Sequence, residues 1–169
     1  LERRFEAVDR SVRRDRVQQR LQARGRAEQS PAGRTDEGLL HHPGELARLL
    51  GRSIAGVVDD RLGAARDAAA QAGAVVVAKG FRTVVAEPGG AAWIIASGDA
   101  GLASGGSGDV LTGLIGAFLA QGLEPVRAAL LGCWLHGRAG ERGGEAYPAA
   151  VPASVLPELV ARAWRQLTD

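Results

Sequence analysis

Hydrophobic and polar positions alternate in a regular way only from Leu39 onward. Pro43 suits the first turn of a short helix, and Gly51 suits the left-handed residue that ends it. Residues 57–71 form an alanine-rich pattern that predicts a longer helix, ended by Gly73. The ordered part of the chain is therefore expected to open with two helices.

Three strands are predicted next. The run AVVVA at residues 74–78 is continuous and β-branched, as in a strand buried on both faces. Residues 83–87 and 91–96 are two further strands, and the Pro-Gly-Gly sequence between them favours a hairpin. Lys79 and Gly80 directly follow the first of these strands.

The remaining third of the chain predicts three helices. The first has its apolar residues at helical spacing on one face and is ended by Gly122 and Pro125. The last is expected to begin at an N-cap on Ser154 and to reach Leu167. This order of helices, strands, hairpin and helices predicts an α/β fold with a sheet covered by helices. In the first of these three helices, the apolar positions are Leu111, Leu114, Ile115, Phe118 and Leu119. In the second helix, they are Leu130, Leu131, Trp134 and Leu135.

Composition fits one globular domain. The chain has 169 residues, of which 46% are hydrophobic and 24% charged. It contains no apolar run of the roughly 18 residues that a membrane span needs, and no signal peptide is recognised, so a cytoplasmic protein without membrane contact is expected. Cys133 is the single cysteine, which excludes an internal disulfide and favours a small buried side chain.

Charge is uneven although the net charge is only +2. Ten of the 20 arginines lie within the first 34 residues, mixed with acidic residues. This mixture is typical of a solvated or disordered segment, and no nucleic-acid partner is expected. Residues 1–38 are therefore assigned to an Arg-rich segment that is disordered or foreign to the fold, and residues 39–169 to the domain itself.

The stretch ASGGSGDVLTG, residues 103–113, carries the candidate chemistry. Gly105, Gly106, Ser107 and Gly108 precede a helix, and glycines there let unpaired backbone N–H groups surround an anion. Asp109 follows in the first helical turn. A carboxylate beside a phosphate site suits the removal of a proton from a hydroxyl that attacks phosphorus, while the amides stabilise the transferring group. A plain helix cap is the alternative interpretation.

Three segments in this order resemble the ADP- or ATP-dependent NAD(P)H-hydrate dehydratases, members of the ribokinase-like superfamily. They are LLHHPGELARLLG at residues 39–51, AVVVAKGFRTVVAEPGGAAWI at 74–94, and SGDAGLASGGSGDVLTGLIGAFLAQG at 97–122. The resemblance implies a three-layer α/β sandwich that lacks N-terminal strand–helix units, and so the C-terminal part of the family's domain. It also implies a homo-oligomer, with a tetramer as the expected form.

The resemblance implies a lyase that repairs hydrated NADH or NADPH. A nucleotide, ADP or ATP with Mg²⁺, would phosphorylate the hydrate's hydroxyl, and loss of phosphate would restore the ring. Asp109 would be catalytic and would contact the hydrate together with His42. The residues implied in nucleotide binding are Lys79, Gly80, Phe81, Arg82, Thr83 and Gly108; no metal ligand is implied.

Asp99 departs from the family's pattern, which has asparagine in that place. A second carboxylate near the phosphates weakens nucleotide binding unless it is paired or turned away. Two other functions stay open: a ribokinase-like kinase of a small alcohol, of the hydroxyethylthiazole kinase type, and a non-catalytic remnant. The His-Pro-Gly-Glu and Lys-Gly-x-x-Thr segments favour the dehydratase.

Overall fold

The structure, a computed structural model, describes residues 13–14 and 39–167. The expectation for the Arg-rich segment at residues 1–38 therefore falls outside the described residues, apart from the two-residue strand β1 (Arg13–Arg14). The chain divides into two compact units. Residues 39–80 and 84–94 belong to one, here called the sheet unit, and residues 81–83 and 95–167 belong to the other, the helical unit.

The sheet unit is built on four short strands. They are β2 (Leu39–His41), β3 (Val76–Ala78), β4 (Val84–Ala86) and β5 (Ala92–Ile94). The sheet order is β1-β5-β4-β3-β2, with β2 parallel to β3, and with β3–β4 and β4–β5 antiparallel. The three strands predicted from sequence are confirmed, with shorter bounds. Strand β2 was not predicted.

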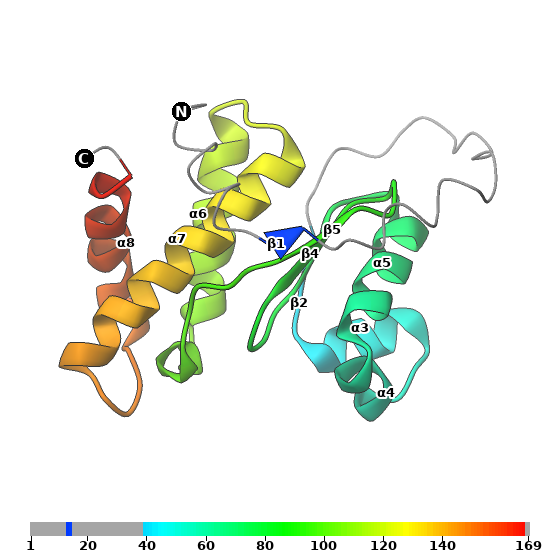
Figure 1. The fold of residues 1–169 in the computed structure, drawn as a ribbon, viewed down its shortest axis with the longest axis horizontal. Helices are drawn as coiled ribbons and strands as arrows, with labels where there is room; N and C mark the ends of the chain where they lie inside the picture. The colour runs from blue at the N-terminus through cyan, green and yellow to red at the C-terminus, as the bar shows by residue number, and fades with distance from the viewer. Residues whose placement is uncertain (1–12, 15–38, 168–169) are drawn as a thin grey trace. The chain divides into compact units, whose positions relative to one another are not determined.

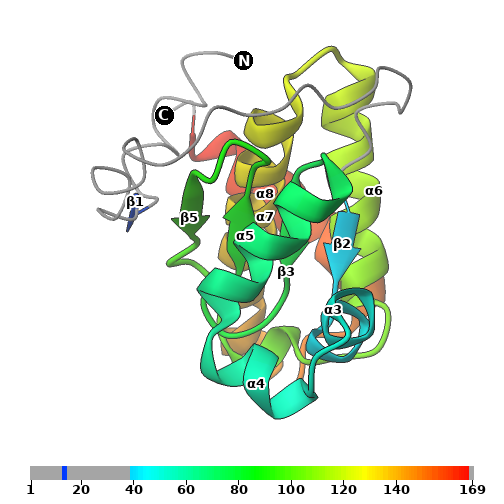
Figure 2. The same cartoon turned by 90° about the vertical axis from the view of Figure 1, so that its right-hand side faces the viewer.

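Side-chain alternation gives this sheet two buried faces. Val77, Val85 and Trp93 stand in register across one face, and all three are buried. On the other face, Val76 and Val84 join a core that includes α3 (Pro43–Leu50), α4 (Ile54–Asp59) and α5 (Arg61–Ala72). Figure 2 shows these three helices in front of the strands. A sheet buried on both faces agrees with the β-branched run predicted at residues 74–78.

Helix α5 lies close to the sheet because its inner face is alanine. Ala64, Ala65, Ala68 and Ala69 are fully buried, and the Arg66 side chain donates a 3.0 Å hydrogen bond to the carbonyl oxygen of Gly90 in the hairpin. The sequence predicted one helix over residues 57–71, and this was wrong. The chain breaks at Asp60, whose carboxylate accepts a hydrogen bond from the Gly63 amide and so begins a new helix.

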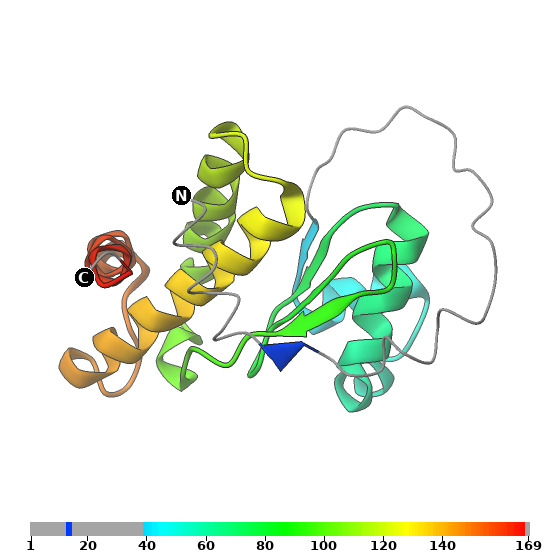
Figure 3. The ribbon, with the colours of Figure 1, turned by 45° about the horizontal axis from the view of Figure 1, so that its top comes forward.

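The helical unit contains α6 (Ser107–Ala120), α7 (Pro125–Ala146) and α8 (Leu156–Arg165). Helix α7 packs against both of the others, as Figures 1 and 3 show. The Phe118 ring of α6 stacks on the Trp164 ring of α8 with centroids 5.6 Å apart. Buried residues of α6 follow the predicted apolar spacing. Among the described residues, every helix is too short or too polar to cross a lipid bilayer.

Two short 3-10 helices complete this unit. One, η1, spans Ala100–Leu102, and the other, η2, spans Ala153–Val155. The predicted N-cap at Ser154 is wrong, because η2 occupies that position and α8 begins after Val155 without a side-chain cap. A tight turn thus replaces the expected cap.

Close packing between α7 and the segment before α6 depends on glycine. A Cβ atom at Gly137 would lie 2.7 Å from the Ser97 carbonyl oxygen, whereas one at Gly116, on the exposed side of α6, would meet nothing within 4 Å.

The two glycines predict opposite effects. Gly137→Ala should lower the free energy of unfolding by about 1–3 kcal/mol, because the methyl group forces the loop away from α7. Gly116→Ala should raise it by about 0.5–1 kcal/mol, because alanine loses less backbone entropy in a helix. Urea unfolding of both variants measures this. Equal and small effects would show that the loop is not packed against α7 as described.

Burial of Cys133 predicts an inert thiol. The side chain is 4% exposed, and burial raises its pKa from 9.0 to about 12. A thiol-reactive dye should therefore leave the folded chain unmodified at about pH 8 and label it after denaturation. The unfolded chain loses the thiol proton first, so this group's contribution to stability should fall as pH rises above 9.0. Rapid labelling of folded protein would contradict the packing of α7.

Candidate functional site

The glycine loop leads directly into helix α6. Gly106 is the N-cap residue and has a left-handed backbone with φ of 83°. Glycine adopts this conformation at little cost, and a Cβ atom there would also lie 3.1 Å from the Cβ of Ala153. The residue type at position 106 is thus set both by the turn and by its neighbour.

Three amides of this loop are available to an anion. Within the described residues, the backbone N–H groups of Gly105, Gly106 and Gly108 donate no hydrogen bond, whereas the amide of Ser107 donates to the Ser104 carbonyl at 3.3 Å. Unpaired amides at a helix N-terminus carry a partial positive charge. They are the groups that would hold a phosphoryl oxygen.

Asp109 lies in the first turn of α6, as the sequence predicted. Its amide donates to the Gly106 carbonyl at 3.1 Å. Its side chain is exposed and makes no hydrogen bond or ion pair with another described residue. The carboxylate therefore does not serve as a side-chain cap here, and it is free to accept a proton from a bound molecule.

The segment before the glycine loop is fixed to α7. The Ser97 hydroxyl donates to the Trp134 carbonyl at 3.1 Å, and the Gly98 amide donates to Glu141 at 2.9 Å. Arg138 forms an ion pair with the other oxygen of Glu141, which is partly buried. Each contact joins the loop to a helix that is itself well buried, so the loop begins from a rigid support.

A second set of contacts fixes the loop on its other side. The Ser104 hydroxyl donates to the Val151 carbonyl at 2.6 Å, and the Val151 amide donates to the Gly101 carbonyl at 2.9 Å. Asp99, the departure from the family's asparagine, accepts a hydrogen bond from the Gly101 amide at 2.9 Å and caps η1. Its carboxylate is therefore paired with the turn.

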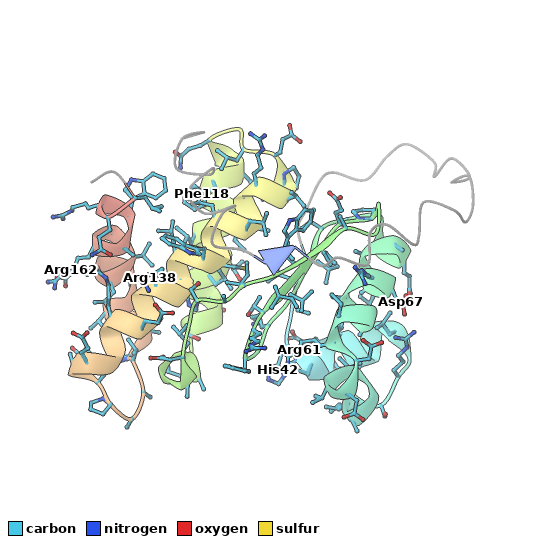
Figure 4. All side chains as sticks on the ribbon, in the orientation of Figure 1. His42, Arg61, Asp67, Phe118, Arg138 and Arg162 are labelled. Atoms are coloured by element: carbon cyan, nitrogen blue, oxygen red, sulfur yellow. The ribbon has the colours of Figure 1, made fainter. Side chains whose placement is uncertain are left out.

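His42 and Lys79 directly follow the paired strands β2 and β3 in the sheet unit. The register of the parallel pair β2 and β3 ends at His41 opposite Ala78, so the next residues are His42 and Lys79. In α/β folds, ligands bind at the carboxyl ends of parallel strands. His42, labelled in Figure 4, is exposed just before α3. Its amide donates to the Glu45 carboxylate at 2.7 Å.

Lys79 and Gly80 open the turn between β3 and β4. The Lys79 side chain is half-buried, and within the described residues it makes no ion pair. Gly80 has φ of 151°, and a Cβ atom there would lie 2.5 Å from a terminal nitrogen of the Arg61 guanidinium. The backbone at this turn is consequently packed tightly against the first residue of α5.

The other three residues of the predicted nucleotide-binding turn belong to the helical unit. Phe81 is 75% exposed, and the Arg82 guanidinium lies 5.3 Å from the centre of its ring. Arg82 itself has a left-handed backbone with φ of 57°. The Thr83 carbonyl accepts a hydrogen bond from the Ile95 amide at 2.9 Å, directly next to the Val84–Ile94 pair of β4 and β5.

Two groups of candidate residues are each brought together within one unit, whereas the turn residues Phe81, Arg82 and Thr83 belong to neither group. His42, Lys79 and Gly80 share the sheet edge, and the glycine loop with Asp109 opens α6. In the described part of the chain, no three His, Cys, Asp or Glu side chains gather where they could hold a metal ion.

Sequence reasoning missed two residues that support the loop, His136 and Glu141. Both lie on α7, and both reach backbone atoms roughly thirty or more residues away in the chain. The only sequence signal for His136 is a polar residue among the apolar positions of its helix. His136 is 7% exposed, and its ring bonds to the backbone of Ser107.

Comparison with known proteins identifies what this arrangement resembles. A family model described as NAD(P)H-hydrate dehydratase matches residues 27–162. The ADP-dependent (S)-NAD(P)H-hydrate dehydratase of Neisseria meningitidis serogroup B is 47% identical over 131 residues, which are 78% of this chain and 44% of the relative. The bifunctional NAD(P)H-hydrate repair enzyme of Escherichia coli is 49% identical over 112 residues, 66% of this chain and 22% of the relative.

A solved structure matches the fold as well. The ADP/ATP-dependent NAD(P)H-hydrate dehydratase of Bacillus subtilis, co-crystallised with ATP and Mg²⁺, superposes with a TM-score of 0.76 and 33% identity, covering 83% of this chain and 51% of that one. The ribokinase-like α/β fold expected from the sequence is confirmed. This chain spans about half the length of these relatives or less. It belongs to the NAD(P)H-hydrate dehydratase family.

Proposed function

We propose that this chain is the C-terminal part of a nucleotide-dependent NAD(P)H-hydrate dehydratase, a lyase that repairs hydrated NADH or NADPH. One observation carries the proposal: an exposed, unpaired carboxylate on Asp109 directly follows a fixed loop with three free amides. The family match supports this substrate over the small alcohol of a hydroxyethylthiazole-type kinase.

In the proposed reaction, Asp109 accepts the proton of the hydrate's hydroxyl. The hydroxyl oxygen then attacks the terminal phosphorus of ADP or ATP, and the bond to the nucleotide's leaving oxygen breaks. The amides of Gly105, Gly106 and Gly108 donate to the phosphoryl oxygens as negative charge accumulates there. Loss of phosphate from the hydrate, together with a proton from the neighbouring ring carbon whose C–H electrons form the new bond, restores the double bond of the nicotinamide ring.

The sheet unit supplies the remaining contacts. Lys79 contributes a positive charge toward the nucleotide phosphates, together with the backbone of Gly80. The turn residues Phe81, Arg82 and Thr83, which belong to the helical unit, are proposed to bind the nucleotide as well. His42 contacts the hydrate. Support for both roles comes from their shared position after the parallel strands β2 and β3.

Mg²⁺ would enter with the nucleotide. This ion is usually held by phosphates, water and one or two carboxylates, so a site with three protein ligands is not required. When bound, it neutralises charge on the phosphates. No residue of this chain is assigned as its ligand. We further propose a cytoplasmic protein that assembles as a homo-oligomer, with a tetramer expected.

The role of Asp109 predicts the effect of Asp109→Asn. Turnover should fall by about 10²- to 10⁴-fold because the amide cannot take the proton, while binding of nucleotide persists. The measurement is recovery of NADH from its hydrate with ADP and ATP tested separately, beside calorimetric titration of nucleotide.

Asp67→Asn is the matched control. Asp67 is an exposed residue of α5 that pairs with Arg52 at 2.6 Å, and exposed pairs contribute little to stability. Turnover should be unchanged in this variant. Loss of nucleotide binding with unchanged turnover in Asp109→Asn would contradict the assigned role. No turnover in the wild-type chain would favour the non-catalytic remnant.

The position of Lys79 predicts a selective effect on the nucleotide. Lys79→Ala should raise the KM for ADP or ATP by about tenfold or more, because a charge-assisted contact to phosphate is lost. The KM for the hydrate should change much less. Equal increases in both constants would contradict a nucleotide-binding turn at Lys79.

A further inference from the structure

His136 forms a buried contact with the first residue of α6. Its ring nitrogen Nε2 lies 2.9 Å from the backbone carbonyl oxygen of Ser107, and the His136 side chain is 7% exposed. A carbonyl oxygen can only accept, so Nε2 must carry the hydrogen and donate it. A buried histidine thus reaches from the middle of α7 to the backbone of the candidate anion site.

Ser107 is held at every polar atom. Its hydroxyl donates to the Leu102 carbonyl at 2.7 Å, its amide donates to the Ser104 carbonyl at 3.3 Å, and its carbonyl accepts from His136. The flanking amides of Gly106 and Gly108 donate to no described residue. A fully bonded serine therefore stands between two glycines whose N–H groups are available.

The carbonyl of Ser107 and the amide of Gly108 belong to one peptide unit. This unit is planar and trans, so its C=O and N–H bonds point in opposite directions. A donor that fixes the carbonyl oxygen on the buried side therefore fixes the direction of the Gly108 N–H on the other side. A hydrogen bond to the carbonyl also polarises the peptide and makes its N–H a stronger donor.

We propose that His136 is a positioning residue that orients and polarises the Ser107–Gly108 peptide, and so prepares the Gly108 amide to bind the transferring phosphoryl group. This inference rests on the proposed function for its catalytic consequence. The contact with the peptide itself stands on the structure alone, which allows the two to be tested separately.

The first experiment needs no turnover. In ¹⁵N-labelled full chain, His136→Phe keeps a ring but removes the donor, and the amide resonance of Gly108 should shift. The resonances of Gly113 and Gly116, on the exposed side of α6, should stay in place. In the wild-type chain, the ring nitrogen shifts of His136 should show a hydrogen on Nε2. An unprotonated Nε2, or an unmoved Gly108 resonance, would overturn the proposal.

The second experiment measures kinetics in three variants. His136→Phe should lower kcat by about tenfold to a hundredfold with little change in the KM for the hydrate, because the amide acts on the transition state. His136→Gln places a donor near the position of Nε2 and should restore much of the loss. Ser97→Ala removes another single hydrogen bond between the loop and α7. It should leave kcat within about threefold, because its contact does not touch the Ser107–Gly108 peptide.

The outcomes of these experiments test the positioning role of His136 separately from the proposed function of the chain. Equal losses of kcat in His136→Phe and Ser97→Ala, in proportion to lost thermal stability, would reduce His136 to a structural role and overturn the inference. If wild-type chain shows no turnover with ADP or ATP, the proposed function fails, and the Gly108 resonance alone decides the case for His136. If His136→Phe does not fold, the role of His136 is tested by the kcat of His136→Gln and by the ring nitrogen shifts of His136 in the wild-type chain.

Discussion

Direct packing of a loop backbone against helix α7 is the constraint on which the candidate anion site depends. The loop can approach so closely only because Gly137 has no side chain where the Ser97 carbonyl lies. At that distance the Ser97 hydroxyl and the Gly98 amide both reach α7. Glycines are thus used here for close approach in the helix, and for backbone conformation in the loop at Gly106.

Because of this packing, some polar groups of the loop are hydrogen-bonded within the protein and others are available to a ligand. Polar atoms that face α7 or Val151 are paired, while the amides beside them and the carboxylate of Asp109 are not. Such a division is useful for catalysis, because groups that do not need to reorganise stabilise developing charge at lower cost. The departure at Asp99 fits the same division, since its carboxylate is occupied by the Gly101 amide.

Local signals predicted much of the fold. Gly51 and Gly73 end their helices with φ of 63°, as their positions after alanine- and leucine-rich runs indicated.

Strand β2 was missed because three residues carry too little pattern, and its evidence is a pairing with β3 more than thirty residues later. The helix break was missed because the Asp60 cap lies inside a continuous helical pattern. The position of Asp109 in the first turn of α6 was predicted from the glycines before it. The bond of His136 to Ser107 was not predicted, because it joins residues 29 positions apart and its one local signal is a polar residue among apolar positions.

Lys79 gives the molecule an unusual chemical property. It is the single lysine among 20 arginines, and it stands half-buried at the end of β3. Guanidinium groups resist reagents that acylate amines, so an amine-directed reagent finds a single side-chain amine in this sequence. Covalent neutralisation of that amine would leave Arg82 as the one cationic side chain of the β3–β4 turn, and mass spectrometry could measure the modified fraction.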